Sequence, residues 1–269
     1  MRTVGVCRFS YVGLGGFKVD HGDRAALAEF LFSPKRMEER FRLFETITLP
    51  SVAAQTDPDF TFLIVTGKHF PVDYLNRLKT ITAAIPQCQI VLYPPRKHRM
   101  IMAKAVNDWR GLPDEPCLQF RLDDDDAMAV TFIEKFKQTA RDLSTITARH
   151  DAVAVDFNQG YVFTAGAQGV KLWPYHYPYS AIALGMIVAA GSTDTIMSHG
   201  HQNLWKSMPT MTFTGEDMMM RGHNGFNDSR LKGKKNVFDY QPMDDTKSAH
   251  ILRTFGVDND HVWAVFSRP

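Results

Sequence analysis

The stretch Cys117-Leu-Gln-Phe-Arg-Leu-Asp-Asp-Asp-Asp-Ala127 places four adjacent carboxylates directly after a short apolar run. The run predicts a mostly buried strand, so the acids would emerge at its carboxyl end, the edge where ligands bind in open α/β sheets. Like charges in one short turn repel each other unless a positive charge lies among them. The simplest such charge is a divalent cation, and oxygen ligands suit Mg²⁺ or Mn²⁺.

Two other interpretations of the acidic run stay open. Charge runs are usually solvated loops, and Asp126 is also placed to cap the helix that the apolar periodicity of Ala127–Phe136 predicts. The position favours a site, because solvated runs normally lie in polar linkers and this one lies between two apolar segments. Capping by Asp126 is compatible with that role.

Outward from this stretch, strands and helices alternate along the first half of the chain. Continuous apolar runs predict strands, and apolar residues at helical spacing, such as Met37, Phe41 and Phe44, predict helices. The predicted strands are Thr3–Cys7, Thr61–Thr66 and Gln89–Tyr93, and the predicted helices begin at Ser33-Pro34, near Val72 and near Met100. Repeated β-then-α units predict an α/β fold with a mostly parallel central sheet flanked by helices.

The second half of the chain is less regular. Ala152–Phe157 and Tyr161–Phe163 are predicted strands, and Asn158-Gln-Gly160 between them predicts a hairpin turn. The aromatic stretch Trp173–Tyr179 is either a proline-braced loop on the sheet or a wall for sugar rings. We see no linker between independent domains, so residues 1–269 are expected to form one domain.

Composition excludes several classes of protein. The 269 residues carry a formal net charge of +2 and have a pI near 8.4, which gives no indication of nucleic-acid binding. Cys7, Cys88 and Cys117 lack the spacing of a zinc site or disulfide framework and are expected to be free thiols. The chain does not open on a secretory signal, and its longest small-apolar run, Ala181–Gly191, is too short to cross a bilayer. We expect a soluble cytoplasmic protein.

Three segments together resemble a known family. They are Leu49-Pro-Ser-Val-Ala-Ala-Gln-Thr-Asp-Pro-Asp-Phe60, Arg121-Leu-Asp-Asp-Asp-Asp-Ala127 and Thr214-Gly-Glu-Asp217. The combination resembles nucleotide-sugar-dependent glycosyltransferases of the GT-A fold and is most similar to a bacterial rhamnosyltransferase family. The resemblance implies a GT-A-like, Rossmann-like fold. Residues 1–127 would bind the nucleotide sugar, and residues 128–269, with a smaller irregular C-terminal region, would bind the acceptor.

In the GT-A fold an Asp-x-Asp motif at the end of the central strand holds a metal that bridges the donor diphosphate. The resemblance gives this place to Asp123 and Asp125, with Asp124 and Asp126 as the alternative pair. We expect Asp125 to be the principal ligand of Mg²⁺ or Mn²⁺, and Asp123 and Asp124 to contact the donor. His223 stands in sequence where such enzymes often have another metal contact, although a lone histidine is more often a hydrogen-bonded or surface residue.

Three arginines complete the donor pocket that the resemblance implies. Arg8 follows the first strand, where such enzymes begin their nucleotide pocket, and Arg96 and Arg99 lie in a basic loop after the third strand. Guanidinium groups are geometrically suited to phosphate. A solvated basic loop explains Arg96 and Arg99 equally well.

The resembling enzymes also carry an acidic pair at the position of Glu216 and Asp217, and one member is the base in inverting enzymes. We expect Asp217 to take the proton of the acceptor hydroxyl, and Glu216 to orient the acceptor. The alternative is a capping box, in which Thr214 and Asp217 satisfy the first amides of a Met-rich helix at Met218–Met220.

The sequence thus predicts a metal-dependent, inverting glycosyltransferase of cell-surface glycan synthesis. It would move a sugar, which the resemblance suggests is L-rhamnose from a dTDP-linked donor, from a nucleotide-sugar donor to a glycan or lipid-linked saccharide acceptor. Membrane contact would be peripheral at most, at the inner face, through the basic stretch Arg230–Asn236. One alternative is a nucleotidyltransferase, for which the glycines of Val12–Phe17 lack the accompanying basic residues. Another is a non-catalytic nucleotide- or carbohydrate-binding module.

Overall fold

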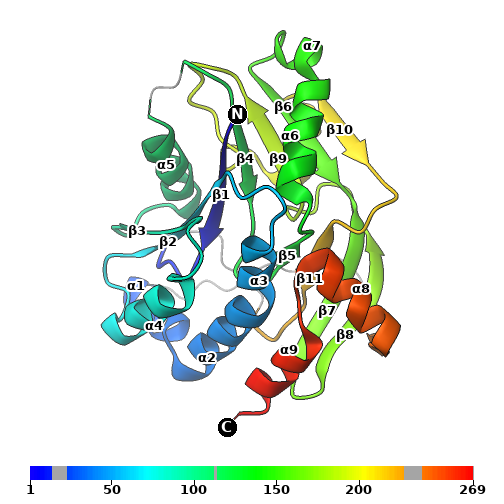
Figure 1. The fold of residues 1–269 in the computed structure, drawn as a ribbon. Coiled ribbons are helices and arrows are strands. Elements are labelled where there is room, and N and C mark those ends of the chain that lie inside the picture. The colour runs from blue at the N-terminus through cyan, green and yellow to red at the C-terminus, as the bar shows by residue number, and fades with distance from the viewer. Residues whose placement is uncertain (14–22, 112–113, 227–237, 269) are drawn as a thin grey trace.

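The computed structural model describes residues 1–13, 23–111, 114–226 and 238–268 (Figure 1). Most of the glycine-rich turn Val12–Phe17 and all of the basic stretch Arg230–Asn236 lie outside these residues. The centre of the fold is a sheet with the strand order β10-β6-β9-β4-β1-β2-β3. Its strands are β1 (Arg2–Arg8), β2 (Thr61–Gly67), β3 (Cys88–Tyr93), β4 (Cys117–Arg121), β6 (Ala152–Phe157), β9 (Leu184–Val188) and β10 (Thr210–Phe213).

The central sheet is mostly parallel, as predicted. β1 pairs in parallel with β2 and β4, β2 with β3, and β6 with β10. β9 lies between β4 and β6 and is antiparallel to both. In the described part of this sheet β9 therefore runs against all the other strands, and the strand order places β6, β9 and β10 beside strands from the first half of the chain.

Helices cover both faces of this sheet. They are α1 (Arg24–Leu31), α2 (Pro34–Leu43), the π-helix η1 (Phe44–Thr48), α3 (Leu49–Ala53), α4 (Val72–Thr82), α5 (His98–Arg110), α6 (Phe132–Asp142), α7 (Ser144–Thr147), the 3₁₀ helix η2 (His201–Lys206), α8 (Asp245–Phe255) and α9 (Asn259–Phe266). Alternate strand residues enter two cores. Phe62 and Ile64 pack with α2, α4 and α6, whereas Leu63 and Val65 pack with α5.

A second, smaller sheet follows the acidic turn (Asp123–Asp126). Its order is β12-β8-β7-β11-β5, with β5 (Ala127–Met128), β7 (Gln159–Gly166), β8 (Gly169–His176), β11 (Met219–Gly222) and β12 (Gln241–Pro242). β5 pairs antiparallel with β11, so that Ala127 faces Met220. α9 packs on β7 and β8 (Figure 1). The second sheet therefore brings a late segment of the chain against the acidic turn.

The structure corrects three local predictions. Asn158-Gln-Gly160 does not form a hairpin, because β6 belongs to the central sheet and β7 to the second sheet. Met219–Gly222 is a strand, so no helix follows Asp217 for a capping box to begin. Asp126 is not a helix cap either, since α6 begins at Phe132 after Thr131. In each case sheet pairing of the neighbouring residues decides the structure, and the local sequence pattern does not.

The state of the cysteines agrees with the expectation from composition. Cys7, Cys88 and Cys117 are free. Burial raises the pKa of Cys88 to about 12 and that of Cys117 to about 11, so both are protonated near neutral pH. Among the described residues, no helix has the length and hydropathy that a membrane-spanning segment needs.

Candidate active site

The acidic turn lies at the carboxyl edge of the parallel strands. β1 and β4 are in register with Val6 opposite Arg121, which brings Arg8, at the end of β1, level with Asp123. Both carboxylate oxygens of Asp123 accept hydrogen bonds of 3.1 Å from Arg121, and the side chain is 41% exposed. Desolvation raises the pKa of Asp123, but the positive charges of Arg121 and Arg8 outweigh it and lower the pKa overall. Asp123 is therefore an ionised, accessible carboxylate beside guanidinium groups.

The next two carboxylates turn inward to a buried arginine of α2. Arg40 Nη1 lies 2.9 Å from Asp124 Oδ1 and 2.9 Å from Asp125 Oδ2. The three side chains are 4%, 8% and 6% exposed, respectively. Burial raises the pKa of Asp124 to about 6, and the charge of Arg40 opposes that rise. The Arg40 guanidinium thus lies among the aspartates of the turn, where the sequence suggested a metal ion.

The last residue of β11 and the residues after it also contact the acidic turn. Asn224 Nδ2 donates to Asp125 Oδ2 at 2.7 Å, and the Gly222 amide donates to Asp126 Oδ1 at 2.8 Å. Arg40 Nη2 donates to the Phe226 carbonyl at 2.8 Å. The inward carboxylates are therefore held by donors from α2 and from the end of the second sheet.

Asp217 and Glu216, which the sequence predicts to act on the acceptor, contact different sets of residues. Asp217 accepts hydrogen bonds from Gln159 Nε2 at 3.0 Å and Tyr161 Oη at 2.6 Å, and its Oδ2 lies 2.9 Å from His250 Nε2. Burial raises the pKa of Asp217, and these three partners lower it by more. Glu216 is more exposed and pairs with Lys135 of α6. Asp217 is therefore ionised and oriented, while Glu216 faces the surface.

The sequence predicted His223 as a metal contact, and the structure places it among aromatic residues. Its Nδ1 lies 2.5 Å from Tyr240 Oη, and its ring meets Phe238 edge-on at 6.1 Å. Phe238 also meets Tyr175, which stacks on Tyr177 at 5.4 Å. Because His223 directly follows Gly222, this aromatic group begins next to the acidic turn and offers flat faces of the kind that stack on sugar rings.

Arg96 and Arg99 are both exposed, and the structure places them differently. The Arg96 amide donates to Tyr11 Oη, which ties the basic loop to the segment after β1. The Arg99 guanidinium lies against Gly200, where an added β-carbon would be 3.8 Å from it. The next residue, His201, lies with Nδ1 2.5 Å from the Tyr179 carbonyl oxygen. Burial and the charge of Arg121 lower the pKa of His201 to about 4, so it is neutral.

Comparison with known proteins gives a family. A family model described as "Putative rhamnosyl transferase" matches residues 2–236. The chain belongs to this family. A search of curated proteins found no match.

Solved structures show weaker similarity. S. aureus TarS (residues 1–349) matches with 9% identity and a TM-score of 0.42, covering 82% of this chain and 60% of TarS. The same TarS fragment in complex with UDP-GlcNAc gives 10% identity and a TM-score of 0.41, covering 84% of this chain and 60% of TarS. A 4-diphosphocytidyl-2C-methyl-D-erythritol synthase from Anaerococcus prevotii gives 12% identity and a TM-score of 0.34, covering 80% of this chain and 87% of the synthase. The family assignment depends on the sequence match, because all three TM-scores are below 0.5.

The acidic turn offers few protein ligands to a divalent cation. Within the described ranges, no three metal-ligating side chains come together. Asp124, Asp125 and Asp126 accept hydrogen bonds or ion pairs from Arg40, Asn224 and the Gly222 amide. Asp123 has the most accessible carboxylate of these four, with a side chain that is 41% exposed. Since Mg²⁺ is commonly held by one or two carboxylates together with substrate phosphates, the site fits a cation held by Asp123 and completed by a diphosphate.

Arg40 is the main site residue that the sequence analysis missed. It belongs to the apolar stripe of α2, between Met37 and Phe41, and is itself buried. Arginine is almost never fully buried unless it is paired. A basic residue at a stripe position was therefore a signal that an acidic partner lies elsewhere in the chain.

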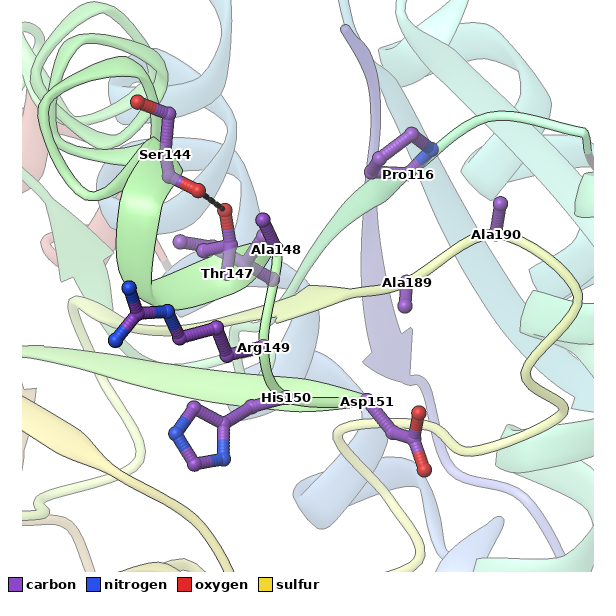
Figure 2. A pocket seen from close by; sticks show the side chains of 10 residues that line it. Pro116, Ser144, Thr147, Ala148, Arg149, His150, Asp151, Ala189 and Ala190 are labelled. Carbon is purple, nitrogen blue, oxygen red and sulfur yellow. Dashed lines mark hydrogen bonds between the residues drawn. The ribbon is translucent and has the colours of Figure 1, made fainter.

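A separate cavity of about 500 Å³ lies away from this site. It is lined by Pro116 before β4, by α7 and the segment to Asp151 before β6, and by Ala189 after β9 (Figure 2). These positions are at the amino edge of the parallel strands, opposite the acidic turn. The cavity therefore has no part in the candidate active site.

Proposed function

We propose that this protein is a glycosyltransferase that binds a nucleotide sugar with its diphosphate over Asp123 and transfers the sugar to a hydroxyl acceptor. The observation that supports this most directly is the accessible carboxylate of Asp123, which lies beside Arg121 and Arg8 at the carboxyl edge of β4 and β1. Ligands of open α/β sheets bind at this edge. Membership of the rhamnosyltransferase family supports the reaction class.

Breaking the bond between the anomeric carbon and the diphosphate puts negative charge on the leaving group. Arg8 and Arg121 have guanidinium groups suited to phosphate oxygens. We propose that Arg99, on α5 beside Gly200, completes the pocket. We propose Mg²⁺ or Mn²⁺ as the cofactor, with Asp123 as its protein ligand. When bound, the cation would neutralise charge on the diphosphate.

We further propose that Asp217 takes the proton of the attacking hydroxyl. Its lowered pKa keeps it ionised at neutral pH, as a base must be, and Tyr161, Gln159 and His250 fix its orientation. Direct attack assisted by this base would invert the configuration at the anomeric carbon. The aromatic group around Tyr175 and His223 would face the sugar or the acceptor saccharide.

L-Rhamnose from a dTDP-linked donor is the transfer that family membership favours. The test is a thermal-shift series with dTDP-rhamnose and other nucleotide sugars, each with and without Mn²⁺, followed by product analysis with saccharide acceptors. A ligand at about 100 times its Kd stabilises the native state by about 2.7 kcal/mol. For a chain of this size that is a rise in Tm of about 5–10 °C.

Asp123→Asn removes the charge of the proposed ligand while keeping its shape, so we expect it to abolish the Tm rise given by the donor with Mn²⁺. Asp151→Asn, at the opposite edge of the sheet, is the matched control and should keep the rise. If no nucleotide sugar shifts the Tm and no sugar is transferred, the proposal is wrong. Formation of a nucleotide sugar from a nucleoside triphosphate and a sugar phosphate would identify a nucleotidyltransferase instead.

A further inference from the structure

We infer that Arg40 is the built-in counter-ion of the acidic turn, so that the turn holds its shape without metal and accepts a divalent cation only when a diphosphate is also present. The inference extends the proposed function, since it assigns a positioning residue to the donor site. It concerns the nucleotide-free protein and can be tested without any sugar transfer.

The ion pairs are the first step. One guanidinium nitrogen, Arg40 Nη1, lies 2.9 Å from a carboxylate oxygen of Asp124 and from one of Asp125. All three side chains are buried. Buried charges are tolerated when they are paired, and removing one partner is strongly destabilising because the other charge is left uncompensated. Arg40 therefore neutralises the negative charge of Asp124 and Asp125, which a metal ion would otherwise have to do.

Asp125 and Arg40 also form hydrogen bonds outside their ion pair. Asp125 Oδ2 also accepts from Asn224, and Arg40 Nη2 donates onward to the Phe226 carbonyl. A cation at Asp125 would have to compete with a guanidinium and an amide for the same oxygen. Asp123 also accepts from a guanidinium, that of Arg121, but its side chain is 41% exposed, against 6% for Asp125, so a cation can reach it. One carboxylate gives a hard cation few protein ligands, so phosphate oxygens are needed to complete its coordination.

A neighbouring arginine provides a control for burial and helix position. Arg36 lies one helical turn before Arg40 on α2 and is equally buried. Its Nη1 donates to the Ser10 hydroxyl and to the Leu31 carbonyl. Its charge also lowers the pKa of Asp124, but by less than the charge of Arg40 does. Replacing either arginine by methionine removes a buried guanidinium from the same helix. The loss of Arg40 also leaves two carboxylates without their shared partner.

The experiment measures the Tm of nucleotide-free wild type, Arg40→Met and Arg36→Met, each with and without MnCl₂, and Mn²⁺ binding by electron paramagnetic resonance. We expect Mn²⁺ to move the Tm of wild type and of Arg36→Met by less than about 1 °C. Arg40→Met should melt about 10 °C below wild type. Mn²⁺ should restore about half of this loss and should be seen bound, because Asp124 and Asp125 then lack the charge of Arg40.

Two results would overturn the inference. One is Mn²⁺ binding by nucleotide-free wild type that Asp123→Asn or Asp125→Asn abolishes. The other is an Arg40→Met protein whose Tm does not respond to Mn²⁺. If Arg40→Met does not fold, the triple variant Arg40→Met, Asp124→Asn, Asp125→Asn is measured in its place. A triple variant that folds and ignores Mn²⁺ supports the counter-ion role, and one that is equally unfolded contradicts it.

The two proposals fail separately. If the Mn²⁺ pattern holds and no nucleotide sugar binds, Arg40 is still the counter-ion and the donor proposal is wrong. If wild type binds Mn²⁺ alone at Asp125 and also transfers sugar, the donor proposal stands and the counter-ion inference is wrong.

Discussion

At the scale of single residues, the four carboxylates of the acidic turn differ in their partners and in their exposure. Asp124 and Asp125 are paired to Arg40 and buried, and Asp126 accepts the Gly222 amide. Asp123 is ionised beside Arg121 and accessible. Four identical side chains thus differ because each meets a different set of donors, and substitutions along the turn should have different effects.

The residue-scale prediction concerns Asp217. Asp217→Asn removes the negative charge that would take the acceptor proton, while the proposed donor site around Asp123 keeps its groups. We expect transfer to slow by at least about 100-fold, with the Tm rise given by the donor unchanged. Initial rates and thermal shifts on the same preparations measure both quantities. Glu216→Gln, at an exposed neighbour paired with Lys135, is the control and should lose less than about tenfold. A parallel loss of donor binding in Asp217→Asn would make Asp217 a structural residue.

At the scale of elements, the contact between β11 and the acidic turn is the decisive one. β11 pairs with β5 directly after the turn, and its last residue, Gly222, donates to Asp126. A β-carbon on Gly222 would lie 2.3 Å from the Asp125 carbonyl oxygen. Only glycine allows the two backbones to approach this closely.

Gly222→Ala should therefore push β11 away from the turn. We expect a loss of about 1–3 kcal/mol in the free energy of unfolding, together with a weaker Tm rise on donor binding. Urea denaturation and thermal shift measure these effects. Gly225→Ala is the control, since its added β-carbon meets nothing within 4 Å. If both variants behave as wild type, the contact at Gly222 is not tight in solution.

At the scale of the whole molecule, strands from both halves of the chain share the central sheet. β4 ends at the acidic turn and pairs with β9, which comes more than 60 residues later. β6 and β10 extend the sheet beyond β9. A fragment of residues 1–127 would expose the edge of β4 and the apolar face that α6 covers, and such an edge favours aggregation.

We therefore expect residues 1–269 to unfold in one cooperative transition, and residues 1–127 alone to show none. Scanning calorimetry tests the first expectation by comparing calorimetric and van't Hoff enthalpies. Near-ultraviolet circular dichroism during heating tests the second. Two resolved transitions in the full chain, or a cooperative melt of the fragment, would show that the halves are separate folding units.

The sequence by itself determined the features that depend on near neighbours. The apolar runs at Thr61–Thr66 and Cys117–Leu122 predicted parallel strands, and Pro34 with the stripe of Met37 and Phe41 predicted α2. The four aspartates of the acidic turn lie at the carboxyl edge of the sheet because they come just after β4 in the chain. Periodicity within one segment encodes such features directly.

The tertiary structure alone decided which charges meet. Arg40 and Asp124 are 84 residues apart, and the Asp217 partner His250 lies 33 residues further along the chain. The same applies to Met219–Gly222, which is a strand because β5 and β7 offer hydrogen-bond partners on both sides. The local pattern of a segment does not contain its distant partners, and burying a charge or a backbone polar group is stable only once those partners are in place.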